Sequence, residues 1–191
     1  MTPMVDASAL GPVGQTTARK LEVDYLSDRT LARIVGGLRS IRLDAGLSQN
    51  ALAAGLPVRG RAISEWETRA IEPALDHLIQ WSRELGQRLA IVDRRGELRT
   101  VRQRPDESWE TFTRRRLAWP LKSRRQFRGW SQDKLGLLVG VTQDSIQRWE
   151  LARVPPRPIS LVVWAQKLDC AVVLRPIDPA TGDFKRTGPA A

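Results

Sequence analysis

Residues 48–67 read SQNALAAGLPVRGRAISEWE. Ser48 suits the N-cap of a short helix, because its hydroxyl can accept a hydrogen bond from an amide two or three residues later. Pro57 stops that helix, since proline lacks an N–H and clashes with the preceding turn. The apolar residues that follow, Ile63 and Trp66, are spaced for the inner face of a second helix. The stretch therefore predicts two short helices joined by a turn.

The flanking sequence predicts the elements that brace these two helices. Apolar residues recur three or four apart from Leu31 to Ile41, which is typical of a helix, and Gly46 suits the left-handed position after it. Residues 75–85 show the same helical spacing. Residues 88–93 and 97–102 then read as extended segments around a turn at 94–96, which predicts a β-hairpin.

The whole pattern occurs twice, with an offset of 83 residues and no gap. Fifteen of the 48 aligned positions are identical. The identical residues of the first copy are Leu38, Ser40, Arg42, Gly46, Ser48, Gln49, Leu52, Val58, Ile63, Trp66, Glu67, Pro73, Leu78, Trp81 and Leu85. An internal repeat of this kind indicates a duplicated domain.

The second copy is expected to repeat the architecture of the first. After a short connector at residues 104–105, Asp106 or Ser108 caps a helix that Pro120 kinks or restarts. Residues 171–178 and 183–185 predict a second hairpin. We expect a mainly α protein: an unstructured tail over residues 1–26, domains over 27–103 and 104–186, and a second tail over 187–191.

Composition narrows the range of functions. The chain has 191 residues and a formal charge of +10, and only five of its 31 basic residues are Lys. An Arg-rich surface favours bidentate hydrogen bonds to phosphate and guanine. The apolar runs are too short to span a bilayer, and one Cys with one His supports neither a disulfide framework nor a usual zinc site. Catalytic motifs are absent, so neither an enzyme nor a cofactor is expected.

Both copies resemble the lambda-repressor-like (Cro-type) DNA-binding domains. The resemblance rests on Arg42, residues 46–49, Leu52-Ala53, Val58, Ile63-Ser64 and Glu67, and on their equivalents at positions 125–150. It implies five-helix bundles over residues 30–92 and 113–174, each holding a helix-turn-helix. In the first copy Pro57 stands where the family prefers a turn glycine, which predicts a distorted turn.

The resemblance also implies which residues meet DNA. Gln49 and Gln132 would bind phosphates at the starts of their helices. Arg61 and Arg148 would each form bidentate hydrogen bonds with guanine. Gln143 would read adenine, and Glu65 or Asp144 would accept from cytosine or hold a neighbouring Arg. The full expected set is Gln49, Arg59, Gly60, Arg61, Ser64, Glu65, Thr68, Arg69, Gln132, Thr142, Gln143, Asp144, Ser145 and Arg148.

Other polar residues are assigned structural or accessory roles. The resemblance implies that the Arg42–Glu67 and Arg125–Glu150 pairs are salt bridges that connect the first helix of each copy to the third. The seven basic residues of 113–128 are expected to add contacts to the DNA backbone. All seven Trp and Cys170 are expected in the core or at its boundary, and His77 on a helix surface.

The sequence thus predicts a cytoplasmic, nucleoid-associated transcription regulator, of the phage or mobile-element repressor kind. Its partner would be double-stranded DNA, bound by one chain as a pseudo-dimer on an asymmetric operator rather than by a homodimer. We keep two alternatives: an antitoxin that binds a toxin through its hairpins and represses its own operon, and a nucleoprotein factor of low sequence preference.

Overall fold

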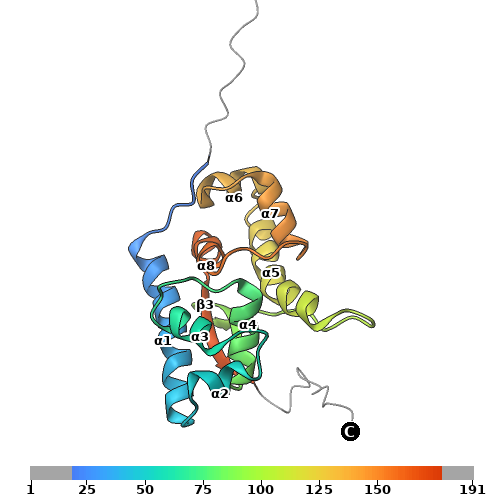
Figure 1. The fold of residues 1–191 in the computed structure, drawn as a ribbon. Helices are drawn as coiled ribbons and strands as arrows, with labels where there is room; N and C mark the ends of the chain where they lie inside the picture. Colours follow the sequence, from blue (N-terminus) through green and yellow to red (C-terminus); the bar gives the residue numbers. More distant parts are fainter. Residues whose placement is uncertain (1–18, 178–191) are drawn as a thin grey trace, which may run out of the picture.

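The structure is a computed structural model that describes residues 19–177, and it is mainly helical with one small sheet (Figure 1). The first copy contains α1 (Tyr25–Asp44), α2 (Gln49–Ala53), α3 (Gly60–Glu67), α4 (Leu75–Glu84), β1 (Gln87–Asp93) and β2 (Gly96–Glu97). The second contains α5 (Trp109–Phe127), α6 (Gln132–Val139), α7 (Gln143–Glu150), α8 (Pro158–Lys167) and β3 (Ala171–Pro176). The expected tandem arrangement is confirmed.

Within residues 19–177 each copy has four helices, and a strand stands where the resemblance implied a fifth helix. Gly86, with φ of +67°, ends the first copy's last helical turn in the left-handed region that favours glycine. The segment that follows buries Leu89, Ala90 and Ile91 in a strand. The five-helix expectation is therefore wrong for this chain.

One continuous apolar core joins the two copies. Its most buried side chains come in equivalent pairs, such as Leu38 with Leu121 and Trp81 with Trp164. Cys170 is buried as expected, and burial raises the pKa of its thiol. Trp119 is 44% exposed, so the expectation that every Trp lies in the core or at its boundary is wrong there.

Helix α5 runs through Pro120 without a restart. Proline has no N–H to donate to the carbonyl four residues earlier, which here belongs to Arg116. The Thr100 hydroxyl donates to that carbonyl at 3.0 Å and so supplies the missing hydrogen bond. Ser108, rather than Asp106, caps the start of α5 by accepting from the Thr111 amide at 3.2 Å.

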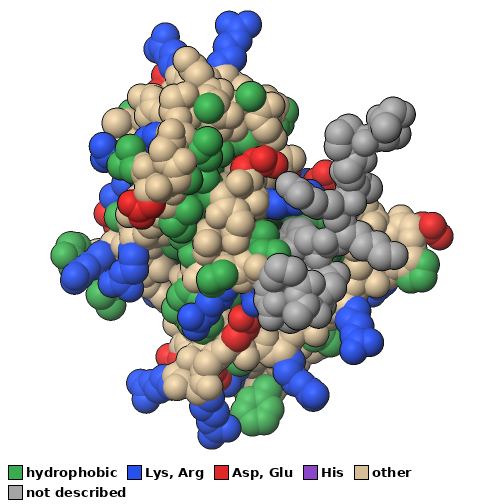
Figure 2. All heavy atoms as spheres, turned by 90° about the horizontal axis from the view of Figure 1, so that it is seen from below, with side chains coloured by type: hydrophobic (Ala, Val, Ile, Leu, Met, Phe, Trp, Pro, Cys, Tyr) green, Lys and Arg blue, Asp and Glu red, His purple; other side chains and the backbone are tan. Residues whose placement is uncertain are grey.

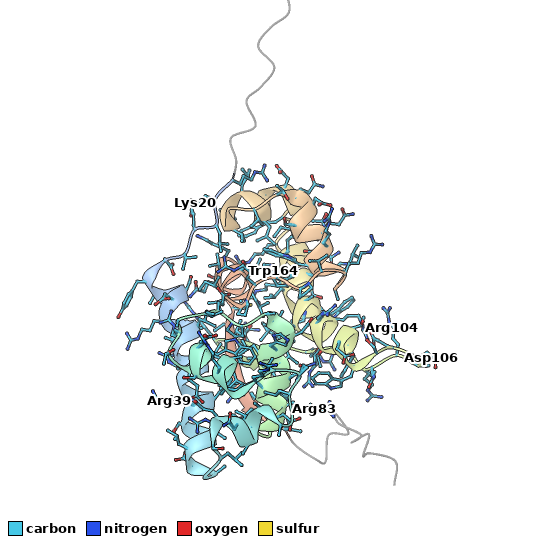
Figure 3. All side chains as sticks on the ribbon, viewed as in Figure 1. Lys20, Arg39, Arg83, Arg104, Asp106 and Trp164 are labelled. Atoms are coloured by element: carbon cyan, nitrogen blue, oxygen red, sulfur yellow. The ribbon has the colours of Figure 1, made fainter. Side chains whose placement is uncertain are left out.

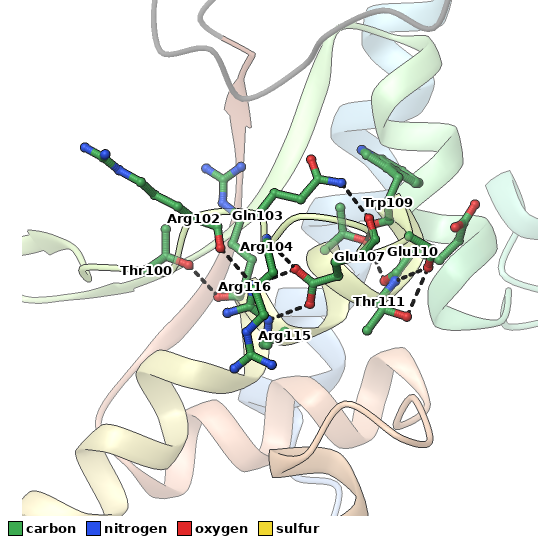
Figure 4. A network of polar contacts seen from close by, with 12 residues as sticks. Thr100, Arg102, Gln103, Arg104, Glu107, Trp109, Glu110, Thr111, Arg115 and Arg116 are labelled. Carbon is green, nitrogen blue, oxygen red and sulfur yellow. Dashed lines mark hydrogen bonds and ion pairs between the residues drawn. The ribbon is translucent and has the colours of Figure 1, made fainter.

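The connector between the copies is held by a polar network around Glu107 (Figure 4). The Glu107 carboxylate accepts from Arg115 Nε at 2.7 Å and Nη2 at 2.6 Å, and from the Arg104 amide at 3.0 Å. Arg115 also donates to the Arg102 carbonyl at 2.8 Å. The hydrogen bond from Arg115 is the main cause that lowers the pKa of Glu107 to about 2.

Residues 19–26, which the sequence placed in an unstructured tail, have a defined structure. Helix α1 begins at Tyr25, and residues 19–24 form an N-terminal strap that crosses to the second copy. Arg19 donates to Asp133 at 2.8 Å and to the Val141 carbonyl at 3.2 Å. The expected unstructured boundary at residue 26 is therefore wrong for residues 19–26. Residues 1–18 and the expected tail at 187–191 lie outside the described residues.

Strands of the two copies pair with each other in a sheet of order β2-β1-β3. Ala90 pairs with Val173, and these are equivalent positions of the 83-residue repeat. The pair Leu89–Leu174 is likewise repeated as Val172–Ile91. A local two-fold axis therefore passes between Ala90 and Val173. The return strand expected at 183–185 lies outside the described residues.

Candidate nucleic-acid interface

The two helix-turn-helix units lie on either side of the strand pair, with α2 and α3 at the lower end of Figure 1 and α6 and α7 at the upper end. Each unit begins at a serine cap. Ser48 accepts from the Ala51 amide at 3.0 Å, and Ser131 accepts from the Lys134 amide at 3.0 Å. The caps that the sequence predicted for both second helices are thus confirmed.

The turns of the two units differ at one equivalent position. In the second unit Gly140 ends α6 with φ of +82°, in the left-handed region. The equivalent residue in the first unit is Pro57, whose ring holds φ near −65° and excludes that turn. Helix α2 accordingly ends at Ala53, earlier than Pro57 alone predicted, and a longer turn leads to α3. The expected distortion of the first turn is confirmed.

Behind each unit lies a buried Arg–Glu–Gln cluster. In the first copy Arg42 binds Glu67 through Nε at 2.6 Å and Nη2 at 2.8 Å, and donates to the Leu47 carbonyl at 2.6 Å. Gln49 donates to the same Glu67 carboxylate at 2.9 Å. Burial raises the pKa of Glu67, but the bonds from Arg42 and Gln49 outweigh it and hold the pKa below its usual value.

The second copy repeats this cluster with nearly the same geometry. Arg125 binds Glu150 at 2.6 and 2.9 Å, and Gln132 donates to Glu150 at 2.8 Å. The side chains of Arg125 and Glu150 are only 9% and 1% exposed. The pairs therefore fasten the first helix of each copy to the third, which confirms their structural role. They also fix the amide of each Gln at the start of its helix.

The outward faces of α3 and α7 carry most of the expected contact residues. Arg61 pairs with Glu65 at 2.8 Å, and Arg148 pairs with Asp144 at 2.8 Å, each one helical turn apart. Each acid thus holds a neighbouring Arg, one of the two roles foreseen for it. Arg61 is 88% exposed.

The remaining expected residues lie at the ends of these helices. Arg59 is the exposed N-cap residue of α3, without a capping bond from its side chain. Thr142 caps α7 through the Ser145 amide at 3.2 Å, and Gln143 is exposed beside it. Thr68 is exposed at the end of α3, where its hydroxyl donates to the Ser64 carbonyl at 2.9 Å.

Two expected contact residues do not lie on the outward face of α3. Gly60 is buried, and a Cβ there would lie 1.9 Å from Oδ1 of Asn50, so this position serves the close packing of α3 on α2. Arg69 follows α3 with φ of +59° and pairs with Asp28 of α1. Gly60 therefore serves helix packing and Arg69 an ion pair, and their expected contacts to DNA stay predictions.

The basic stretch 113–128 is mostly engaged within the protein. Arg116 is buried, and five other basic residues form intramolecular ion pairs. The pairs are Arg114–Asp76, Arg115–Glu107, Arg124–Asp93, Arg125–Glu150 and Arg128–Asp169. These arginines hold α5 to its neighbours, and the expected contacts of this stretch to the DNA backbone stay a prediction.

The structure adds two candidate DNA-contacting residues of the strap that the sequence did not reveal. Arg19 of the strap reaches the turn between α6 and α7, where its guanidinium bonds Asp133 and the Val141 carbonyl. Lys20, next in the strap, also lies beside α6 (Figure 3). Neither residue has a counterpart in the periodic pattern, so no sequence signal marked them. Seen from below, Lys and Arg side chains project on several sides of the protein, and acidic side chains are fewer (Figure 2).

Residues 38–92 and 121–173 each match the family model described as Helix-turn-helix, and together they make up more than half of the chain. No curated protein and no solved structure matches the chain. Between residues 19 and 177, no helix is long and apolar enough to cross a membrane. Each matched segment contains one of the two units described above.

Proposed function

The chain belongs to the helix-turn-helix family of DNA-binding transcription regulators, and on that premise we propose that it is a repressor that occludes a promoter, of the kind that phages and mobile elements carry. One chain would place both α3 and α7 on duplex DNA. It would act at the nucleoid, with Gln49 and Gln132 on phosphates and the outward residues of α3 and α7 on bases.

The observation that carries this proposal is the register of β1 and β3. Pairing centred on Ala90 and Val173 relates the two strands by a local two-fold axis. Proteins with this motif read two half-sites about one helical turn, roughly 10 base pairs, apart, and their dimer symmetry matches that of the operator. The duplication would supply an equivalent arrangement within one chain.

The two reading faces differ, so the proposed operator is asymmetric. Arg61 and Glu65 of α3 stand where α7 carries Asp144 and Arg148, which reverses the order of charge along the helix. Each face would therefore favour a different set of base edges. The antitoxin alternative, in which a toxin binds the hairpins, is less favoured because β1 of the first hairpin is paired on both sides, by β2 and β3.

Selection of binding sites from random duplexes by the purified chain tests sequence specificity. Enrichment of one asymmetric site is expected. Equal recovery of all sequences would instead favour the nucleoprotein alternative.

Replacing Arg148 by alanine is expected to weaken binding to the selected site by about 1 to 3 kcal/mol and to relax preference at one base pair. Gln132→Ala should weaken binding to all sequences alike, because a phosphate contact carries no sequence information. Arg95→Ala is the control, since it removes the same charge from the exposed β1–β2 turn. Competition titrations at fixed salt measure these effects. A uniform loss across sequences for Arg148→Ala would contradict its assignment to a base.

A further inference from the structure

A cavity of about 290 Å³ lies where the strap, α1, the end of α3 and the start of α8 meet. Its apolar wall is formed by Leu31 and Val35 of α1, Trp66 of α3 and Ile159 of α8, all of them buried. Small-molecule sites in proteins are mostly apolar concavities of about 300–1,000 Å³ with a few polar groups, and this cavity is at the lower end of that range.

Two ion pairs lie at the edge of this cavity. Arg157 pairs with Glu72 at 2.5 Å, and Glu72 also accepts from the Ile159 amide at 3.0 Å. Arg69 pairs with Asp28. The Arg157 side chain is 71% exposed, so further N–H donors of its guanidinium are accessible to a ligand.

The equivalent site of the second copy is filled. There the cavity is only about 10 Å³, between α5, the end of α7 and the start of α4. Leu31 and Ile159 of the open site correspond to Arg114 and Asp76, through the 83-residue offset. Arg114 Nε binds Asp76 Oδ1 at 2.8 Å, and this ion pair occupies the position that two apolar side chains leave open in the first copy.

At the edges of the two sites, it is the first copy that carries the charged residues. Arg69, Glu72 and Arg157 of the open site correspond to Ala152, Pro155 and Ala74. The first copy thus combines an apolar interior with a charged edge, whereas the second combines a charged interior with an uncharged edge at these positions. The apolar interior and charged edge of the first copy suit an amphiphilic small molecule.

We propose that this cavity binds a small organic anion, an aromatic or aliphatic carboxylate. Its apolar part would lie against Trp66 and Ile159, and its carboxylate would bind the guanidinium of Arg157. Guanidinium binds carboxylate through two parallel hydrogen bonds, and the +10 charge of the chain attracts an anion over a cation.

A ligand in this cavity would contact the first helix-turn-helix unit directly and the second through the strap. Trp66 belongs to α3, and the strap residues Leu21 and Val23 line the cavity next to the segment that binds α6. The ligand would therefore change DNA affinity, and DNA would change ligand affinity by the same factor. This regulatory step rests on the proposed function, whereas the binding site itself does not.

Titration calorimetry of the full chain, without DNA, tests the site with 1-naphthaleneacetate and its uncharged amide as probes. One acid molecule is expected per chain, with the amide bound at least tenfold more weakly. Absence of heat with millimolar acid, a different stoichiometry, or equal binding of the amide would contradict the proposal. A failure of DNA binding alone would contradict the proposed function and leave this result unchanged.

Two variants locate the probe. Leu31→Arg combined with Ile159→Asp installs the ion pair that the second copy already accommodates, and it should abolish binding while the protein still unfolds cooperatively. Arg157→Gln, at an exposed position, should reduce acid binding at least tenfold and leave amide binding unchanged. Unaltered acid binding by either folded variant would overturn the proposed site.

Discussion

Replacing Glu150 by alanine is expected to lower the free energy of unfolding by about 3 to 5 kcal/mol, because removal of one member of a buried ion pair leaves the other charge without a partner. Arg125, whose side chain is 9% exposed in the wild type, would lose both bonds to the carboxylate. Gln132 would lose its acceptor as well. Denaturant unfolding of the free protein measures the change, and the continuous core predicts one transition.

Asp144→Ala is the matched control for Glu150→Ala. It removes another acid of α7 that pairs with an arginine, but this pair is more than half exposed on both sides. Exposed pairs contribute about 0 to 1 kcal/mol, so little change in stability is expected. Glu67→Ala should reproduce the large loss in the first copy, where the geometry is equivalent. Unchanged stability of Glu150→Ala together with lost DNA affinity would place Glu150 at the DNA instead.

The second large effect is a loss of stability in acid that depends on Glu107. Its pKa falls from 4.5 to about 2 in the folded protein, chiefly through the hydrogen bond from Arg115. A carboxyl whose pKa is lowered by folding stabilises the protein above its unfolded pKa, and this contribution is lost as pH falls through the folded pKa. The contribution is up to about 3 kcal/mol above pH 4.5, and it disappears between about pH 4.5 and 2.

Comparison of the wild type with Glu107→Gln isolates this contribution. The variant should be less stable at neutral pH, and the difference in unfolding free energy should shrink as the pH is lowered through the window of the Glu107 titration. Glu110→Gln, in the exposed first turn of α5, is the control and should leave the pH profile unchanged. A difference that stays constant with pH would contradict the role given to Glu107.

The sequence predicted those features that depend on local spacing. The order of the helices followed from the 83-residue repeat, the serine caps at Ser48 and Ser131 and the helical spacing of apolar residues. The Arg–Glu pairs followed from the resemblance. Long-range packing was less accessible. Helix α2 ends at Ala53, before Pro57, and Gly60 packs on Asn50. Both features depend on how the two helices pack against each other.

The sequence also did not show which basic residues form ion pairs within the protein. The arginines of 113–128 resemble a DNA-contacting stretch in sequence, but their partners, such as Asp76 and Asp93, lie more than 30 residues away and become visible only in the fold. Arg19 was placed in a tail for the same reason, because its partner Asp133 is 114 positions distant. The two-fold register of β1 and β3 is the most informative of these long-range features.

Sedimentation velocity of the chain with a duplex carrying one selected site tests the pseudo-dimer most directly. If both helix-turn-helix units of one chain read that site, the complex contains one protein per duplex, the site is asymmetric, and inverting one half-site abolishes tight binding. Two chains bound to a palindromic site would contradict the account.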